Sequence, residues 1–432
     1  MTHALTLAVL ASGASACGSG SDADRKRYDS RPAESSLPLG TEWVRAWGGA
    51  LGDGASDVAV TADAIYVVGS FVGTVDLDPG DGEFSRSTTS SRDPGVTGSG
   101  QTSLTKFDLN GNFLWAQALP GPRVNHQPDV AVSESGTVYV AGGFNGSDDF
   151  DPGPAEDLHQ APIGGGYYLS AFDPSGAHLF ARTWDASVPE SSEAEVELAT
   201  EGGALYILGQ LVTTGTAVGA ALARLDPDDG SELWAVNLNT NYAQGLSVAP
   251  GRVAAALVNP AGIALFGDDG SEIALGPWQS YVEPHAVALA EDGSMYVAGL
   301  VHEPFDGQMP DLDPSSAEDR RGAFGNDDAA VIALDPGGDY VWGRLFGGAG
   351  GDNARVLTLL PGGALAVSGI FRKSVDFSLG AGSDVREARE ADSFVLELNS
   401  DGSPRGAFTF GSDGDDWSPA MAPLGADKLL LA

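Results

Sequence analysis

The stretch Lys106–Trp115, KFDLNGNFLW, decides the fold, because it can be interpreted as a calcium loop, a cofactor motif or a tight turn. An EF-hand loop needs Gly at its sixth position and Glu at its twelfth. Counted from Asp108, the sixth position holds Phe113 and the twelfth holds leucine, which excludes the EF-hand. Asn110-Gly111 is instead a strong signal for a two-residue type I′ turn between two strands. The stretch therefore predicts a β-hairpin.

This hairpin belongs to a repeat. Related turns recur as PSG, PDDG, DDG, PGG and SDG, each preceded by a short apolar run bounded by Gly, Asp, Asn or Pro. In most copies, the strand that stands second in the repeat unit ends near a glycine. The copies of this second strand are AIYVVGSF (64–71), TVYVAGGF (137–144), ALYILGQL (204–211), RVAAALV (252–258), SMYVAGL (294–300), ALAVSGIF (364–371) and KLLLA (428–432).

Four short strands per unit and no helical period predict an all-β fold, a β-propeller of seven blades with about four antiparallel strands each. The chain ends supply the last blade: TEWVRAWGG (41–49) is a lone fourth strand, and residues 417–432 supply a first and a second. We expect these terminal strands to close the ring. The composite blade lacks a third strand, so we expect it to be incomplete and the sequence to be truncated at Ala432.

The segments WVRAWGGALGDGASDVAV (43–60) and WGRLFGGAGGDNARVLTL (342–359) are each followed by a Gly-ended strand and then by VDLDPG or VDFSLG. They resemble the bacterial SBBP-type β-propeller repeats, and the resemblance covers residues 41–432. It implies a propeller in an exported or surface protein, and no defined activity. LDPDDGSELW (225–234) also resembles the repeat of quinoprotein dehydrogenase propellers, in which this motif is structural.

The N-terminus predicts export. Ala4–Ala11 is an apolar run too short to span a bilayer and suited to a signal peptide. The following Ala14-Ser15-Ala16-Cys17 resembles a bacterial lipobox, although the lipobox prefers Leu at the place of Ala14 and the n-region has no Lys or Arg. We predict a signal peptide over residues 1–17, lipidation of Cys17, and a flexible polar tether over residues 18–40. The alternative is an incidental cysteine in a cleaved signal peptide.

Charge and cysteine content exclude several classes of protein. The 432-residue chain has 60 acidic and 22 basic residues and a formal net charge of −38, which repels phosphate backbones and argues against nucleic-acid partners. Cys17 is the only cysteine of the sequence, so there is no disulfide framework. No later run approaches the length of a membrane-spanning helix, so we expect an exported, soluble body anchored by lipid.

A second acidic pattern predicts a calcium site. Each motif places two aspartates two residues apart, which in an extended chain puts both carboxylates on one face. The alternative is an Asp-Pro-Gly turn with exposed acids, because one loop offers too few ligands without a second loop. The six residues concerned are Asp76, Asp78, Asp149, Asp151, Asp311 and Asp313, and VDFSLG (375–380) is a partial copy.

Catalytic signatures are not found. The sequence has no Gly-x-Ser-x-Gly, His-Glu-x-x-His or Walker motif, and its six histidines do not cluster. Tryptophans recur in phase and predict packing between blades rather than a site; they are Trp43, Trp115, Trp234 and Trp342.

These observations favour a binding or scaffolding propeller, lipid-anchored on the bacterial surface or in the periplasm, whose ligand is a protein or glycan. The alternative is an exported polysaccharide lyase or hydrolase using loop carboxylates. A quinoprotein-like or metal-dependent oxidoreductase ranks third.

Overall fold

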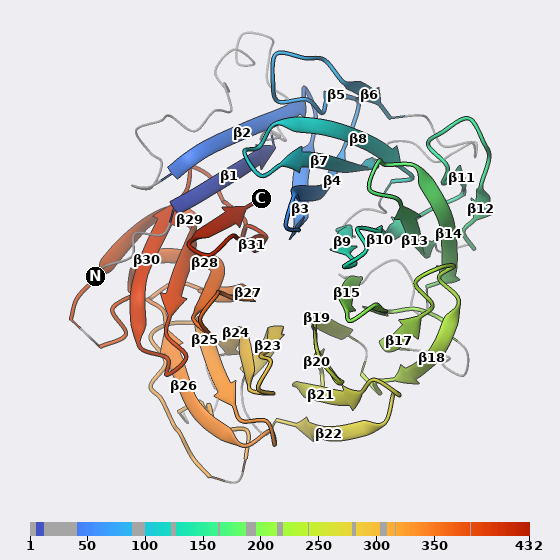
Figure 1. Ribbon diagram of the computed structural model, residues 1–432. Helices are drawn as coiled ribbons and strands as arrows, with labels where there is room; N and C mark the ends of the chain where they lie inside the picture. The colour runs from blue at the N-terminus through green and yellow to red at the C-terminus, as the bar shows by residue number, and fades with distance from the viewer. Residues whose placement is uncertain are drawn as a thin grey trace. The chain divides into compact units, whose positions relative to one another are not determined.

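The computed structural model describes residues 6–12, 41–88, 100–121, 127–162, 165–186, 196–213, 219–240, 242–278, 282–302, 309–315, 317–380 and 382–432. In these ranges all the helical or extended elements are strands. The chain is an all-β protein of the β-propeller class, built from successive four-stranded antiparallel sheets, as predicted (Figure 1). None of the described ranges contains a helix long and apolar enough to cross a membrane.

The chain divides into two compact units. Unit 1 comprises Met1–Val218, Ala223–Leu233 and Asp427–Ala432, and unit 2 comprises Gly219–Leu222 and Trp234–Ala426. The number of blades and the closure of the ring stay predictions.

Unit 1 contains two complete four-stranded sheets and two appended hairpins. The first sheet has the order β3(Asp53–Val60), β4(Ala64–Phe71), β7(Gln101–Asp108), β8(Phe113–Leu119), and the second β9(Asp129–Val132), β10(Val138–Phe144), β13(Gly166–Phe172), β14(His178–Asp185). The appended hairpins are β5(Thr74–Asp76) with β6(Ser85–Ser87) and β11(Ser147–Asp149) with β12(Leu158–Gln160). The unit boundary passes through the sheet β15(Glu197–Glu201), β16(Ala204–Gly209), β17(Ala221–Leu225), β18(Glu232–Asn237).

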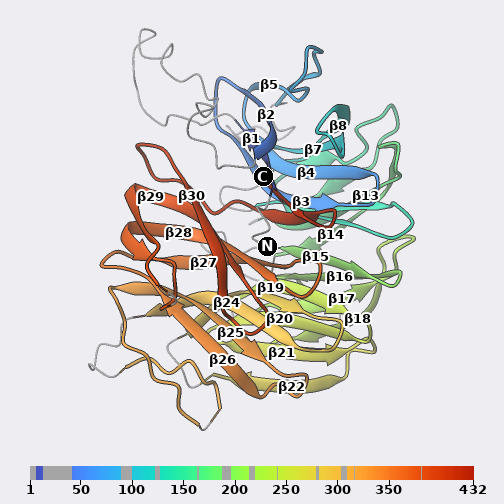
Figure 2. The ribbon, with the colours of Figure 1, turned by 60° about the vertical axis from the view of Figure 1, so that its left-hand side comes forward.

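Unit 2 repeats the same order of strands in three sheets, of which β27 to β30 are seen side by side in Figure 2. They are β19(Tyr242–Ala249), β20(Arg252–Val258), β21(Gly262–Gly267), β22(Glu272–Pro277); β23(Val282–Leu289), β24(Met295–His302), β25(Asp327–Leu334), β26(Tyr340–Phe346); and β27(Asn353–Leu359), β28(Leu365–Asp376), β29(Val385–Leu398), β30(Pro404–Phe410). The unit ends with β31(Met421–Leu424).

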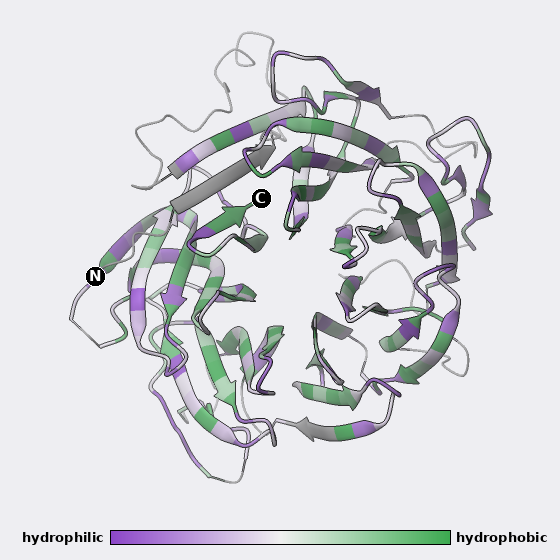
Figure 3. Cartoon of the chain, in the orientation of Figure 1, coloured by the Kyte–Doolittle hydropathy of each residue, from purple (hydrophilic) through white to green (hydrophobic). Residues whose placement is uncertain are grey.

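The second strands are the core of their sheets. Every second strand predicted from the sequence is a strand, and all seven residues of β10 are buried. A strand between two neighbours in its sheet, with both faces covered, takes apolar residues at successive positions, which explains the runs of Val, Ile, Leu and Ala. The outer strands β8, β14 and β26 instead mix apolar and polar residues (Figure 3), because one of their faces is exposed.

The strand β2(Thr41–Gly49) belongs to a sheet that combines strands from both ends of the sequence. The strand β1(Thr6–Ser12) lies between β2 and β32(Lys428–Leu431) and pairs parallel with both, whereas the complete four-stranded sheets described above are antiparallel. Lys428 Nζ also donates a hydrogen bond to Glu42 Oε1 at 2.9 Å. The third position of this sheet, expected to be empty, is taken by residues of the predicted signal peptide; that peptide and the tether stay predictions.

The stretch Lys106–Trp115 forms the hairpin between β7 and β8, but its predicted type I′ turn is wrong. Gly111 N–H donates to the Asp108 carbonyl at 3.0 Å and Asp108 N–H to the Asn112 carbonyl at 2.9 Å, which encloses a three-residue loop. Of its residues only Gly111 has positive φ, +73°, whereas a type I′ turn also needs it at Asn110. The cause is the Asp108 carboxylate, whose Oδ1 accepts the N–H groups of Asn110 and Asn112 at 2.9 Å each. The result is a type I turn closed by a left-handed glycine.

The outer strand of one sheet holds the turn of the next. Trp115 of β8 packs over Gly176, where an added Cβ would lie 3.0 Å from the indole ring, and its Nε1 donates to the Pro174 carbonyl at 3.2 Å. This confirms the prediction that the in-phase tryptophans pack between blades. The same arrangement joins Trp43 to Gly111, Trp234 to Gly270 and Trp342 to Gly402.

Candidate functional site: the appended acidic hairpins

Each predicted Asp-x-Asp motif opens a hairpin appended to the end of a second strand. The residue between the two aspartates is an apolar anchor, since Leu77, Phe150 and Leu312 are at most 1% exposed and belong to the hydrophobic core. Phe377 takes the same position in the partial copy. Because side chains alternate along an extended chain, burial of this middle residue turns both flanking carboxylates away from the core.

The first aspartate of each motif closes the loop of its hairpin. Asp149 Oδ1 accepts the N–H of Asp151 at 3.2 Å and that of Asp157, eight residues on, at 2.9 Å. The same two bonds are made by Asp76 (3.1 and 2.8 Å), Asp311 (3.1 and 2.8 Å) and Asp376 (3.0 and 2.9 Å). One carboxylate oxygen therefore replaces a missing strand pairing in all four hairpins.

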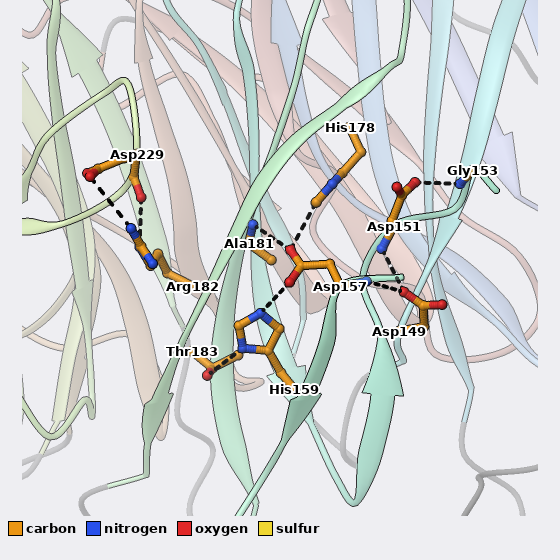
Figure 4. Close-up of polar contacts among 10 residues, drawn as sticks. All are labelled: Asp149, Asp151, Gly153, Asp157, His159, His178, Ala181, Arg182, Thr183 and Asp229. Atoms are coloured by element: carbon orange, nitrogen blue, oxygen red, sulfur yellow. Dashed lines mark hydrogen bonds and ion pairs between the residues drawn. The ribbon is translucent and has the colours of Figure 1, made fainter. Parts of the chain in front are cut away.

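The second aspartate caps a smaller turn. Asp151 Oδ1 accepts the N–H of Gly153 at 2.6 Å (Figure 4). Asp78 does the same for Gly80, and Asp313 for Ser315, each at 2.8 Å. These bonds give every predicted calcium residue a backbone partner, so the structure brings each pair together as a capped turn. The described part of the chain contains no group of three or more His, Cys, Asp or Glu side chains placed to hold a metal ion. Calcium binding at these pairs stays a prediction.

The return strand of each hairpin carries a charged or aromatic pair that the sequence analysis missed. Eight and ten residues after the first aspartate stand Asp157 with His159, Asp319 with Arg321, and Asp384 with Arg386, joined at 3.0, 2.6 and 2.7 Å. In the hairpin β5–β6 the pair is Phe84 with Arg86, whose guanidinium lies 3.9 Å from the ring centroid. The sequence signal is an Arg or His ten residues after the first aspartate, as at Arg86, His159 and Arg321.

In the hairpin β11–β12 this pair also fixes the hairpin to the outer strand β14 (Figure 4). Asp157 Oδ2 accepts the N–H of Ala181 at 3.2 Å, and His159 Nδ1 lies 3.2 Å from Thr183 Oγ1. In unit 2, Asp319 similarly accepts a hydrogen bond from the Tyr340 hydroxyl of β26. The side-chain hydrogen bond from Arg321, followed by that from Tyr340, holds the pKa of Asp319 below its usual value.

What remains free for recognition is the tip of each hairpin. Asp81 and Glu83 are exposed at the tip of β5–β6, and Glu156 at the tip of β11–β12. The frame is the same in all four copies while the exposed residues differ. This is the arrangement of a rigid scaffold that carries variable binding loops.

A second acidic cluster lies on the first strands of unit 1 and was not predicted. Asp57 Oδ2 accepts the N–H of Val130 at 3.2 Å, and Asp129 Oδ2 accepts the N–H of Leu198 at 2.5 Å, so each first strand is tied to the next. Burial, and then the nearby carboxylates of Asp57 and Glu197, raise the pKa of Asp129 well above its usual value. The signal in the sequence is an acid before Val or Leu in successive first strands.

The remaining predicted residues have other fates. Cys17 lies outside the described residues, as do His3 and His126. The four other histidines each lie near a carboxylate: His159 and His178 near Asp157, His285 and His302 near Glu283.

No protein-family model and no curated protein matches this chain. Among solved structures, the WD40 β-propeller domain of Doa1 is similar at 10% identity and a TM-score of 0.46, over 87% of this chain and 88% of that one. BamB from Moraxella catarrhalis is similar at 14% identity and a TM-score of 0.38, over 84% and 99%. The computationally designed Ika8 protein is similar at 12% identity and a TM-score of 0.42, over 85% and 90%. At such identities and scores none of them indicates a function for this chain.

Proposed function

We propose that this chain is an exported β-propeller that acts as a binding or scaffolding module on the bacterial surface or in the periplasm. The observation that carries the proposal is the set of four hairpins with one hydrogen-bonded frame and different exposed residues. The partner is a protein or a glycan that contacts these tips. The SBBP-type resemblance of residues 41–432 supports the propeller architecture and an exported or surface location, and it implies no defined activity.

The binding function is tested with the full chain on glycan arrays and in cross-linking to cell-envelope proteins. Asp81→Ser with Glu83→Ser changes one tip and leaves the Asp76 frame intact. A ligand lost with this double variant, and kept by Asp339→Ser on an exposed turn elsewhere, supports recognition by the hairpins. Binding that no hairpin-tip variant weakens would contradict it.

The anchor belongs to the same proposal, with Cys17 as the lipidated residue. Cys17→Ser should move the protein from the membrane fraction to the soluble fraction and abolish incorporation of labelled palmitate. A variant that remains fully bound to membranes would sink the lipidation.

Calcium is the proposed ligand of the Asp-x-Asp pairs, whose Oδ1 atoms already accept backbone N–H groups. A chelator-treated protein titrated with calcium should melt at a higher temperature if the pairs bind it, since a ligand held only by the native state stabilises that state. The replacement of Asp78, Asp151 and Asp313 by Asn should remove the part of the rise that these pairs contribute. A triple variant that keeps the full rise of the wild type would contradict calcium binding at these pairs.

The alternative function, an exported polysaccharide lyase or hydrolase, is favoured by one observation, the cluster of Asp57, Asp129 and Glu197. A carboxyl with a raised pKa beside two further carboxyl groups is suited to donate a proton in glycoside cleavage. Activity on a panel of polysaccharides that Asp129→Asn abolishes would replace the binding function with this one.

A further inference from the structure

Two crossover loops of unit 2 each place an aspartate beside a buried aspartate of a neighbouring strand. Asp328, Asp352 and Asp392 are buried, and Asp416 is half-buried. In the loop from β26 to β27, Asp352 Oδ2 accepts the N–H of Gly348 at 2.6 Å, and Asp352 N–H donates to the Asp327 carbonyl at 2.8 Å. In the loop that follows β30, Asp416 Oδ2 accepts the N–H of Ser412 at 2.6 Å. Asp416 N–H likewise donates to the Ala391 carbonyl at 2.8 Å. The first bond places Asp352 beside Asp328 on β25, the residue after Asp327. The second places Asp416 beside Asp392 on β29, the residue after Ala391.

The carboxylates of each pair converge on a glycine. A Cβ added to Gly347 would lie 2.1 Å from Asp328 Oδ1 and 2.9 Å from Asp352 Oδ2, so these two oxygens are within about 5 Å of each other. A Cβ added to Gly411 would lie 2.4 Å from Asp392 Oδ1 and 2.8 Å from Asp416 Oδ2. A side chain at either glycine would collide with these carboxylates, so the close approach of the two acids requires glycine at both positions.

One oxygen of each pair is buried without a hydrogen-bond partner. Asp328 is fully buried, its Oδ2 accepts the N–H of Phe324 at 2.7 Å, and its Oδ1 accepts nothing. Asp392 is 9% exposed, and its Oδ1 is likewise buried without a hydrogen-bond partner. A buried carboxylate oxygen that lacks a donor loses its hydration without compensation, which points to a cation, a water molecule or a proton at that place.

The nearby basic side chains form their closest contacts with other groups. Arg372 pairs with the exposed Asp415 at 3.0 Å, and Lys373 Nζ donates to the Ala349 carbonyl at 2.9 Å. Arg389 is paired with the exposed Asp413. Burial, and secondarily the charge of Asp352, raise the pKa of Asp328 to about 6. Burial also raises the pKa of Asp352 overall, although the charges of Arg372 and Lys373 act against this. It raises the pKa of Asp392 as well, although the charge of Arg389 acts against it.

We propose that the pairs Asp328–Asp352 and Asp392–Asp416 are divalent-cation sites and that their ion is calcium. Hard divalent cations take carboxylate, carbonyl and water oxygens, and calcium accepts the irregular geometry of a loop better than magnesium does. Two carboxylates per site are available, and carbonyl and water oxygens complete the shell, consistent with the lack of a three-acid group in the ranges that the structure describes. These sites are separate from the Asp-x-Asp hairpins and fix each first strand to the sheet before it.

The experiment uses the full chain, stripped with a chelator and melted with and without calcium chloride. We expect calcium to raise the melting temperature of the wild type by at least about 5 °C. Asp328→Asn and Asp392→Asn should each remove a large part of the rise, while Asp339→Asn, on an exposed turn, should keep all of it. Equilibrium dialysis of the wild type, which needs no variant, should find two tightly held calcium ions that magnesium does not displace.

Three outcomes would overturn the proposal. The first is less than one tightly held calcium per chain. The second is a calcium-induced rise in melting temperature that Asp328→Asn and Asp392→Asn both retain and the triple Asp-x-Asp variant loses. That result would assign the ion to the hairpins. The third is a chelator-treated wild type that calcium does not stabilise but that gains stability below about pH 6 in an Asp328-dependent way, which would mean that the pair holds a proton.

Discussion

At Gly111 two separate penalties attach to any side chain. Its φ of +73° is left-handed, and an added Cβ would lie 2.9 Å from the ring of Trp43. The left-handed conformation costs an L-residue about 1–2 kcal/mol, and overpacking against a ring typically adds about 1–3 kcal/mol. We expect Gly111→Ala to lower the free energy of unfolding by about 2–5 kcal/mol, measured in urea.

Gly251 is the matched control for the contact with tryptophan. Its φ is +77°, and nothing lies within 4 Å of the Cβ position. Gly251→Ala should therefore lose only the conformational part, about 1–2 kcal/mol. Equal losses at the two glycines would show that Trp43 gives way freely and that its packing over the turn adds no stability.

A carboxylate that closes a hairpin can be tested at Asp149. Asp149→Ala leaves the N–H groups of Asp151 and Asp157 without their acceptor, and loss of two charge-assisted bonds in a half-buried place should cost about 1–3 kcal/mol. Urea unfolding measures the loss. Glu156→Ala, which removes an exposed acid from the same loop, should change stability by less than about 0.5 kcal/mol. A similar effect of the two substitutions would contradict the closing role.

The Asp-x-Asp motif shows how far residue-level prediction reaches. Its spacing correctly predicts that both carboxylates share a face, because the period of an extended chain is two. The sequence analysis overlooked the apolar residue between them, although Leu77 and Phe150 were the visible sign that the motif anchors a hairpin in the core. The bond to a residue eight positions away could not be predicted, since it depends on the path of the whole loop.

At the scale of the element, His302 ties the end of β24 to two neighbouring strands. Its Nε2 lies 3.0 Å from Glu283 Oε2 on β23, and its Nδ1 lies 3.0 Å from Asp327 Oδ1 on β25. Burial by itself would lower the pKa of His302, but the hydrogen bonds to Glu283 and Asp327 raise it overall. Hydrogen bonds from His285 and then from His302 lower the pKa of Glu283 to about 2.

These two shifts act in different ranges of pH. A raised histidine pKa stabilises the fold fully below its ordinary value of 6.5, and this stability is lost as the pH rises through the folded pKa. The lowered pKa of Glu283 stabilises the fold above its ordinary value of 4.5 and fails only as the pH falls toward about 2. Both contributions are present between these two ordinary values.

His302→Gln should therefore destabilise the protein more at about pH 5.5 than at about pH 8.5, because the stability that comes from a raised imidazole pKa falls as the pH rises. Free energies of unfolding in urea at the two pH values measure the gap between variant and wild type. A gap that stays constant with pH would mean that His302 acts through packing or neutral hydrogen bonds. His159→Gln, in the hairpin β11–β12, is the control. It shows whether replacement of a different histidine gives the same dependence of stability on pH.

Elements differ in how well the sequence predicts them. The second strands are predicted because a strand with both faces buried is apolar at successive positions, as in β10. The three-residue strands β5 and β12 are not, since a strand of three residues is too short to show an apolar alternation. The turn after β7 is predicted as a hairpin and wrongly as type I′, because the Asp108 side chain overrides the preference of the Asn-Gly pair.

At the scale of the whole molecule, the dominant feature is a formal net charge of −38. Most ion pairs of the described residues use exposed or half-exposed groups, such as Arg389 with Asp413, and exposed pairs add little stability. A charge of this size repels itself and destabilises the compact state. It also raises the local concentration of cations, which favours occupation of buried acidic pairs such as Asp328–Asp352.

Screening of this repulsion should stabilise the protein without any specific site. In the presence of a chelator, an increase of sodium chloride from about 0.02 M to about 0.5 M shortens the Debye length from about 20 Å to about 4 Å. The melting temperature should rise by a few degrees, and choline chloride should give the same rise because only ionic strength matters. Calcium at millimolar concentration changes the ionic strength little. If the buried pairs bind calcium, calcium chloride should raise the melting temperature more than sodium chloride of equal ionic strength does. Equal effects of the two salts would leave general screening as the whole cause.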